Sequence, residues 1–147
     1  MPVRWQEEDF VTLNVRYSNP PGLAKMPGYN HVVEIAGPAR VIYVAGQLGY
    51  DAAGKRVGAP GDFRSQAVQA FENVKIALAH AGAGFANVVK VNSYIVDIAR
   101  HIATYRQVRD NYMDSGALPP STAVGVTALA REPEALFEIE VVAILPG

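Results

Sequence analysis

Two carboxylates near the C-terminus, Glu138 and Glu140, are spaced so that they could share one face of a strand, and carboxylates can transfer protons. They occur in residues 136–144, where apolar residues recur at every second position, the pattern of a β-strand with one buried face. Because residues two apart in a strand point to the same side, the carboxylates are expected roughly 6.5 to 7 Å apart. Alternate strand residues meet the spacing of a catalytic acid pair trivially. The pattern therefore predicts a shared polar face but no particular reaction.

The other residues that could take part in catalysis or ligand binding give weaker signals. The three histidines, His31, His80 and His101, lie on different predicted elements and lack metal-ligand spacing, so a metal site is not indicated. The absence of cysteine excludes disulfides, a thiol nucleophile and cysteine-based metal sites. Residues 46–58 are glycine-rich but match neither the G-x-G-x-x-G nor the G-K-S/T pattern of phosphate loops. We interpret these glycines as turn residues.

Hairpins are the elements expected to position the two carboxylates. Residues 118–130 and 136–144 are predicted to pair as strands, joined by the polar, proline-containing loop 131–134. Residues 31–36 and 40–45 predict a second, tight hairpin. Its second strand is apolar on both faces, as expected of a central strand covered on both sides.

Two further strands and two helices complete the prediction. Residues 11–17 and 87–97 alternate as strands do. A helix is predicted from an N-cap at Asp62 to about residue 81, and a second from residue 98 to about 113, each with one apolar stripe. Two helices cannot cover both faces of a sheet this wide, so they are expected to pack on one face. Glu138 and Glu140 would then lie on the opposite face, toward solvent or another subunit.

Composition narrows the class of protein. The 147-residue length predicts a single domain over residues 1–147. A net charge of −1 without a basic cluster argues against nucleic-acid binding. Charged residues are 18% and hydrophobic residues 50% of the chain, which favours an oligomer that buries part of the surface. A polar N-terminus and no run of ~20 apolar residues predict a cytoplasmic protein without a membrane partner.

Several short motifs occur in an order that is characteristic of one family. They are residues 44–47 (Val-Ala-Gly-Gln), 71–74 (Phe-Glu-Asn-Val), 88–91 (Val-Val-Lys-Val) and the segment from Pro119 through 138–143 (Glu-Ile-Glu-Val-Val-Ala). Together they resemble the reactive intermediate deaminase (RidA/YjgF) family over residues 29–144. The resemblance implies an α+β, chorismate-mutase-like subunit: a six-stranded, mostly antiparallel sheet with two helices packed on one face. It also implies a homotrimeric barrel with small-molecule pockets between subunits. Of the two carboxylates, Glu138 is expected to be an exposed or barrel-lining residue.

The resemblance also implies an activity and a set of site residues. Active members hydrolyse enamines and imines to a carbonyl compound and ammonia without metal or cofactor. By position, Tyr29 and Glu140 are the candidate catalytic residues, with Glu140 as general acid/base. The backbone of Ala45 and Gly46 is the candidate ligand-binding turn. His31 is the histidine expected nearest this site.

The sequence departs from the family at the carboxylate-binding arginine. Where deaminase members have an arginine in a Pro-x-Arg-Ser pattern, this chain has Ser121, followed by Thr122. A hydroxyl cannot form the bidentate ion pair that a guanidinium makes with a carboxylate. Ser121 and Thr122 remain candidate substrate-binding residues, and the substrate is expected to be atypical unless another arginine, such as Arg16, Arg40 or Arg131, reaches the pocket.

Three functions follow from these observations. The first is a homotrimeric hydrolase that deaminates a small enamine or imine. The second is a non-catalytic trimer that binds or senses a small metabolite. The third, ribonuclease or translation inhibitor, has only an older family label behind it and lacks a basic surface in its favour.

Overall fold

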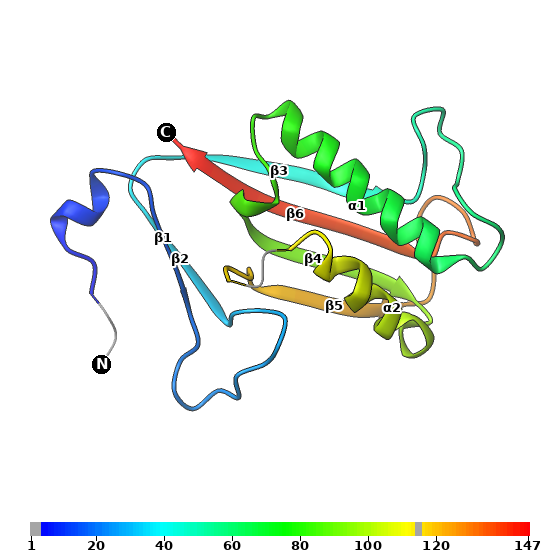
Figure 1. The fold of residues 1–147 in the computed structure, drawn as a ribbon, viewed down its shortest axis with the longest axis horizontal. Coiled ribbons are helices and arrows are strands. Elements are labelled where there is room, and N and C mark those ends of the chain that lie inside the picture. Colours follow the sequence, from blue (N-terminus) through cyan, green and yellow to red (C-terminus); the bar gives the residue numbers. More distant parts are fainter. Residues whose placement is uncertain (1–3, 114–115) are drawn as a thin grey trace.

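The computed structural model describes residues 4–113 and 116–147; residues 1–3 of the predicted polar N-terminus lie outside this part. Figure 1 shows a four-stranded sheet with both helices on one face and a two-stranded arm beside it. Neither helix is long and apolar enough to cross a membrane within the described residues. In chain order the helices and strands are β1 Asn14–Ser18, β2 Val32–Ala36, β3 Ala39–Leu48, α1 Phe63–His80, β4 Val88–Val96, α2 Ile98–Asp110, β5 Ser121–Val126 and β6 Phe137–Pro146, with 3₁₀ turns at Glu7–Phe10 and Phe85–Asn87.

The larger sheet has the strand order β3-β6-β4-β5, with β6 antiparallel to both neighbours. The predicted hairpin between residues 118–130 and 136–144 is wrong, because β4 lies between β5 and β6. Instead β5 runs parallel to β4. Parallel neighbours need a crossover connection, and α2 supplies it. The 131–134 loop therefore crosses over one strand to reach β6.

The predicted hairpin of residues 31–36 and 40–45 is also wrong. At Gly37 the backbone takes a φ of +87°, and a β-carbon there would overlap the Thr12 carbonyl oxygen. The chain turns at this point, so β2 pairs with β1 while β3 pairs with β6. The single six-stranded sheet expected from the resemblance is therefore divided into sheets of two and four strands.

The prediction that β3 is a central strand is likewise wrong. It is an edge of the larger sheet, and on the face away from the helices its Val41 and Tyr43 side chains are 53% and 80% exposed. Val41 and Tyr43 are thus left uncovered within one chain.

The predicted helices and their packing on one face are confirmed. Asp62 caps α1 by accepting a hydrogen bond from the Ser65 amide at 3.0 Å, and the chain leaves the helix through Gly82, with a φ of +80°. In Figure 1, α1 crosses β3 and β6 while α2 lies over β4 and β5. Between these layers lies the core, in which stacked aromatic rings, Phe71 on Phe137 and on Tyr112, join α1 and the turn after α2 to β6.

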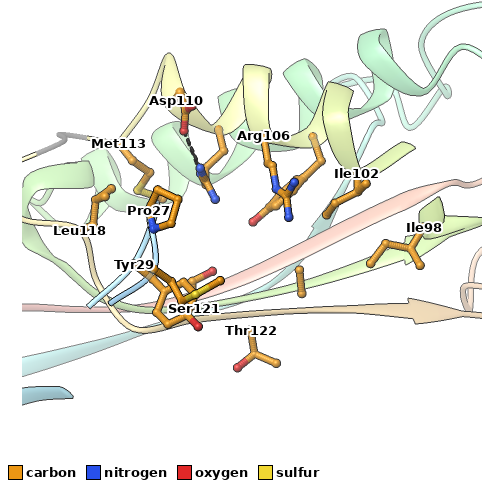
Figure 2. Close-up of a pocket in the computed structure, with 15 residues that line it drawn as sticks. Pro27, Tyr29, Ile98, Ile102, Arg106, Asp110, Met113, Leu118, Ser121 and Thr122 are labelled. Carbon is orange, nitrogen blue, oxygen red and sulfur yellow. Dashed lines mark hydrogen bonds and ion pairs between the residues drawn. The ribbon is translucent and has the colours of Figure 1, made fainter. Parts of the chain in front are cut away.

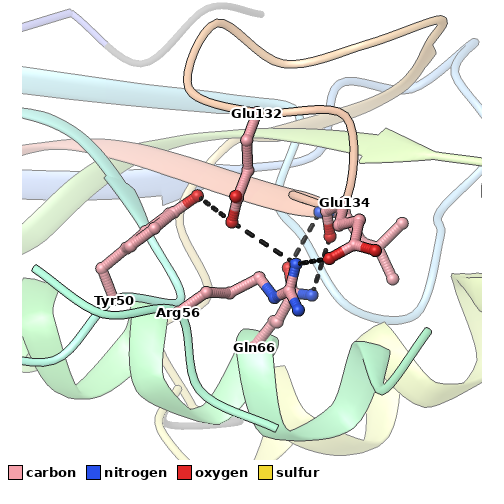
Figure 3. Close-up of polar contacts among 6 residues, drawn as sticks. Tyr50, Arg56, Gln66, Glu132 and Glu134 are labelled. Atoms are coloured by element: carbon pink, nitrogen blue, oxygen red, sulfur yellow. Dashed lines mark hydrogen bonds and ion pairs between the residues drawn. The ribbon is translucent and has the colours of Figure 1, made fainter. Parts of the chain in front are cut away.

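A polar clasp fixes the loop that leads into β6 (Figure 3). The buried Gln66 side chain donates to the Glu134 carbonyl at 3.0 Å and accepts from the Leu136 amide at 2.9 Å. Arg56 forms ion pairs with Glu132 and Glu134. Since Glu138 follows two residues after Leu136, the clasp determines where the first carboxylate of β6 emerges.

We expect Gln66→Leu to lower the free energy of unfolding by about 2 to 3 kcal/mol, because it leaves two backbone groups near the core without partners at nearly unchanged side-chain volume. Chemical denaturation measures this change. Gln107→Leu is the matched control: Gln107 is exposed and, among the described residues, its side chain bonds only Arg64, so its replacement should change stability by no more than about 0.5 kcal/mol. Equal effects of both substitutions would contradict the clasp.

Candidate functional site

Glu140 lies on the face of the sheet that the helices leave open. Its Oε1 atom accepts a hydrogen bond from the Tyr94 hydroxyl at 2.8 Å and another from the Asn92 side-chain amide at 3.1 Å. Both donors come from the neighbouring strand β4, where Asn92 is directly opposite Glu140. The hydrogen bond to the Glu140 carboxylate is the largest cause of a raised pKa of Tyr94, and burial raises it further. Glu140 is thus held in place by two neutral donors.

Glu138 lies on the same open face but in a different setting. Within the described residues its carboxylate has no hydrogen-bond partner. Burial raises the pKa of Glu138, and the negative charge of Glu140 raises it further. The shared polar face predicted from the sequence is confirmed, and Glu138 is the member of the pair whose proton affinity is increased and whose oxygens are unengaged.

A β-bulge brings backbone close to this carboxylate. Opposite Glu140, strand β3 has two residues, Ala45 and Gly46, where regular pairing would have one. Gly46 approaches Glu138 so closely that a β-carbon would overlap the Glu138 Oε1 atom. Gly46 is therefore a strand glycine required by this approach, whereas Gly54, with a φ of +76°, is a turn glycine as predicted.

Tyr29 and Ser121 lie elsewhere, in a cavity of about 1080 Å³ between α2, the start of β5 and the loop of residues 26–29 (Figure 2). The loop is held by Asn30, which donates to the Leu118 carbonyl at 2.7 Å. The Tyr29 ring meets His31 edge to face at 5.3 Å between centroids, which places His31 beside the cavity as expected. In the described chain, neither the Tyr29 hydroxyl nor the Ser121 hydroxyl makes a hydrogen bond.

Thr122 connects the two regions. Ser121 pairs in register with the buried Val91 and faces the helices, whereas Thr122 pairs with Asn92 and faces the open side. The Thr122 hydroxyl accepts from Lys90 at 3.2 Å, and Thr122 also borders the cavity. Thr122, Glu140 and the bulge therefore form one row across four strands.

The predicted site residues thus fall into two half-sites. Glu138, Glu140, Ala45 and Gly46 gather near the β3 edge of the sheet, which we call the acidic half-site. Tyr29 and Ser121 gather at the β5 edge, which we call the tyrosine half-site. One chain does not bring these two groups of residues together.

The structure also identifies two residues that the sequence reasoning missed. Arg106 and Arg109, from α2, line the tyrosine half-site. The arginines suggested from the sequence do not line it: Arg16 lies over the Trp5 ring, Arg40 bonds the Ala81 carbonyl and Arg131 lies over Tyr50. The sequence signal for Arg106 and Arg109 was their position, since they lie three residues apart on one helix and next to its buried stripe.

Among the described residues, no group of three histidine, aspartate or glutamate side chains is placed to hold a metal ion.

This arrangement defines an α+β protein with two helices on one face of a sheet and a pair of carboxylates on the other. The family model described as Endoribonuclease L-PSP matches residues 22–145. A RutC family protein of Aquifex aeolicus is 34% identical over 117 residues, which cover 79% of this chain and 87% of that protein. The 2-iminobutanoate/2-iminopropanoate deaminase of Rattus norvegicus is 35% identical over 105 residues, 71% and 73% of the two chains.

A solved structure is similar as well. The protein YyfB of Yersinia pestis, described as a protein of unknown function of the conserved Rid family, has a TM-score of 0.78 and 36% identity, with 90% of this chain and 99% of that chain covered. The chain described here belongs to the RidA/YjgF family.

We expect Glu140→Gln to lower the pKa of Glu138 toward its ordinary value, because a negative neighbour is removed, while burial keeps it above that value. The pKa of Tyr94 should fall too, since its largest perturbation is the bond to the Glu140 carboxylate. Carboxyl and phenol titrations by NMR measure both. The control Glu72→Gln should affect Tyr112, which it accepts from at 2.8 Å, and leave Glu138 unchanged. If the pKa of Glu138 were the same in the parent and in Glu140→Gln, the electrostatic coupling between the two carboxylates would be refuted.

Proposed function

We propose that residues 1–147 form one RidA-like domain that assembles as a homotrimer and hydrolyses a small enamine or imine to a carbonyl compound and ammonia in pockets between subunits. The observation that carries this proposal is the division of the site into an acidic and a tyrosine half-site at opposite edges of one sheet. A head-to-tail contact, in which one edge region meets the other on the next copy, would complete a site at every interface.

The uncovered face of the sheet supports such an assembly. Val41 and Tyr43 of β3 are large, apolar and exposed, next to the polar row of the acidic half-site. Head-to-tail contacts close into a ring when the rotation between copies permits it, and the resemblance implies three copies. The apolar face would then line the inside of the barrel.

The chemistry requires a water molecule, an electrophilic iminium carbon and a group that moves protons. As the water oxygen bonds to that carbon, the C=N electron pair moves to nitrogen and a carboxylate takes one water proton, which gives a carbinolamine. The carboxyl group then returns this proton to nitrogen, the C–N bond breaks with loss of ammonia, and the remaining O–H proton passes to the carboxylate as the carbonyl group forms. A carboxyl group with a raised pKa suits both transfers near neutral pH. The deaminase name of the similar rat protein supports this reaction class.

Within the acidic half-site, we assign the proton transfers to Glu138. The sequence prediction named Glu140, but one of its oxygens already accepts two hydrogen bonds, whereas Glu138 is unengaged and has the raised pKa. Glu140 would act through its charge, which keeps the proton affinity of Glu138 high. The bulge at Ala45 and Gly46 would present backbone groups to the ligand.

The remaining roles belong to the tyrosine half-site. Tyr29 would close the pocket and donate a hydrogen bond, and Ser121 and Thr122 would orient the ligand. Because Ser121 stands where the resemblance implies an arginine, the substrate or the way it is held differs from that of the deaminase members.

The assembly has a direct test. We expect light scattering to give three times the 15.8 kDa chain mass, and Tyr43→Glu to lower that mass because it places a charge in the buried barrel lining. Ile76→Glu is the matched control: Ile76 is 66% exposed on α1, away from the open face, and its substitution should leave the mass unchanged. A monomeric parent would overturn the trimer.

The activity is tested by ammonia release from freshly generated 2-aminoacrylate and from bulkier and uncharged imines. We expect Glu138→Gln to reduce kcat by about 10²- to 10⁴-fold, the usual contribution of a general acid/base, and Glu140→Gln to reduce it less. Glu72→Gln, distant from the sheet face, should retain parental activity.

Two outcomes would redirect the proposal. Loss at Glu140→Gln but not at Glu138→Gln would exchange the roles of the two carboxylates. Turnover that occurs only in Ser121→Arg, with saturable ligand binding by the parent, would make the protein a non-catalytic metabolite-binding trimer.

A further inference from the structure

The cavity of the tyrosine half-site has one apolar wall and one cationic wall. Ile98, Ile102, Met113 and Leu118 line it with aliphatic surface. Across from the small residues of β5, the last two turns of α2 contribute two guanidinium groups, and Figure 2 shows Arg106 reaching into the space between helix and strand. The cavity thus combines positive charge with an apolar surface.

The two arginines are not equivalent, since Arg109 is already engaged. It donates from Nε and Nη2 to Asp110 at 2.9 and 2.7 Å, lies 5.8 Å from the Tyr105 ring centroid, and its side chain is only 13% exposed. The loop that carries Tyr29 packs on it: a β-carbon at Gly28, where φ is +106°, would lie 2.8 Å from Nη2 of Arg109. Arg109 therefore supports the loop.

Arg106 lies one turn earlier and is exposed. Within the described residues it forms no ion pair, and the one carboxylate that lines the cavity, that of Asp110, is bonded to Arg109. Among the described residues its guanidinium makes no hydrogen bond, so its donors are available for a ligand. The unengaged hydroxyls of Tyr29 and Ser121 lie in the same cavity.

We infer that Arg106 binds the carboxylate of a substrate whose remaining part is apolar, and that Arg109 is a positioning residue that holds the Tyr29 loop over it. This inference rests on the proposed function and specifies its substrate class: 2-imino or enamino acids with a branched or aromatic side chain. The carboxylate pairs with Arg106 and accepts from Ser121, and the side chain packs on Ile98, Ile102 and Met113. Ser121 then acts with a guanidinium supplied by the helix in place of one supplied by its own strand.

An alternative explanation is that the two arginines only stabilise the end of α2. Cations near a helix C-terminus are favoured by the helix dipole. This effect and the ion pair with Asp110 together account for the position of Arg109. The same effect does not explain why the neighbouring cation overhangs a large cavity lined by free hydroxyls. A binding experiment separates the two explanations, because dipole stabilisation affects folding and leaves ligand affinity unchanged.

The experiment is calorimetric titration of the assembled protein with 4-methyl-2-oxopentanoate, a branched 2-oxo carboxylate, and with its uncharged primary amide. We expect the parent to prefer the carboxylate and Arg106→Ala to weaken carboxylate binding about 10- to 100-fold, as for the loss of a charge-assisted hydrogen bond. Amide binding should stay unchanged. Arg106→Gln should resemble Arg106→Ala, since the charge is lost in both.

Two further variants sharpen the test. Arg100→Ala, an exposed arginine of the same helix away from the cavity, is the matched control and should bind both ligands as the parent does. Arg109→Ala should weaken the carboxylate and the amide alike, because it releases the loop of Tyr29; a selective loss of the carboxylate would overturn its assignment as a positioning residue.

Binding requires no turnover, so failure of this inference is distinguishable from failure of the proposed function. Arg106-dependent binding without ammonia release would uphold the inference and refute the deaminase. Equal carboxylate affinity in the parent and Arg106→Ala, or no carboxylate binding by the parent, would overturn the inference even where Glu138-dependent deamination occurs.

Discussion

The strict alternation of β6 under two helices is the constraint on which the rest of the structure depends. Phe137, Ile139, Val141 and Ala143 are almost completely buried against the helices, and β6 is paired along both edges. A shift of one residue would expose these side chains and bury Glu138 and Glu140 in the aromatic core. The hydrophobic energy of one face therefore fixes the position of both carboxylates on the other.

That fixed position makes the two carboxylates unlike each other. Burial raises the pKa of Glu138, and the negative charge of Glu140 on the same sheet face raises it further. The surroundings of the two carboxylates also differ: β4 supplies Tyr94 and Asn92 as donors to Glu140, while β3 approaches Glu138 with Gly46. Two glutamates that look equivalent in the sequence therefore differ in the structure: Glu140 accepts two hydrogen bonds, whereas Glu138 has no such partner among the described residues and a raised pKa. This difference allows a division of chemical roles.

Local periodicity allowed the sequence to predict the two helices, the N-cap at Asp62 and the polar face of β6, because each depends on residues a few positions apart. Strand partners depend on the path of the chain between strands. Gly37 turns β2 away from β3, and α2 carries the chain across to a parallel β5; neither event changes the alternation within a strand. Both predicted hairpins failed for this reason. The resemblance predicted Tyr29 and Ser121, which both line the cavity, but the position of Arg106 at that cavity depends on how α2 lies over β5, which no motif describes.

Ser121 and Arg106 are better understood as one feature than as a loss and an unrelated surface cation. The first residues of β5 that face the cavity, Ser121 and Ala123, are small and leave space on the strand side. An arginine at position 121 would bring a third guanidinium beside Arg106 and Arg109, while Asp110 is the one carboxylate among the described residues that lines the cavity. Like-charge repulsion in a partly enclosed space makes that combination unfavourable. A cation supplied from the helix and a small hydroxyl on the strand therefore belong together. The small side chains of the strand leave space for a ligand, and the helix provides the positive charge from the opposite wall, next to the aliphatic surface of Ile98 and Ile102. A ligand held this way has its carboxylate under α2 and its carbon chain along the same helix.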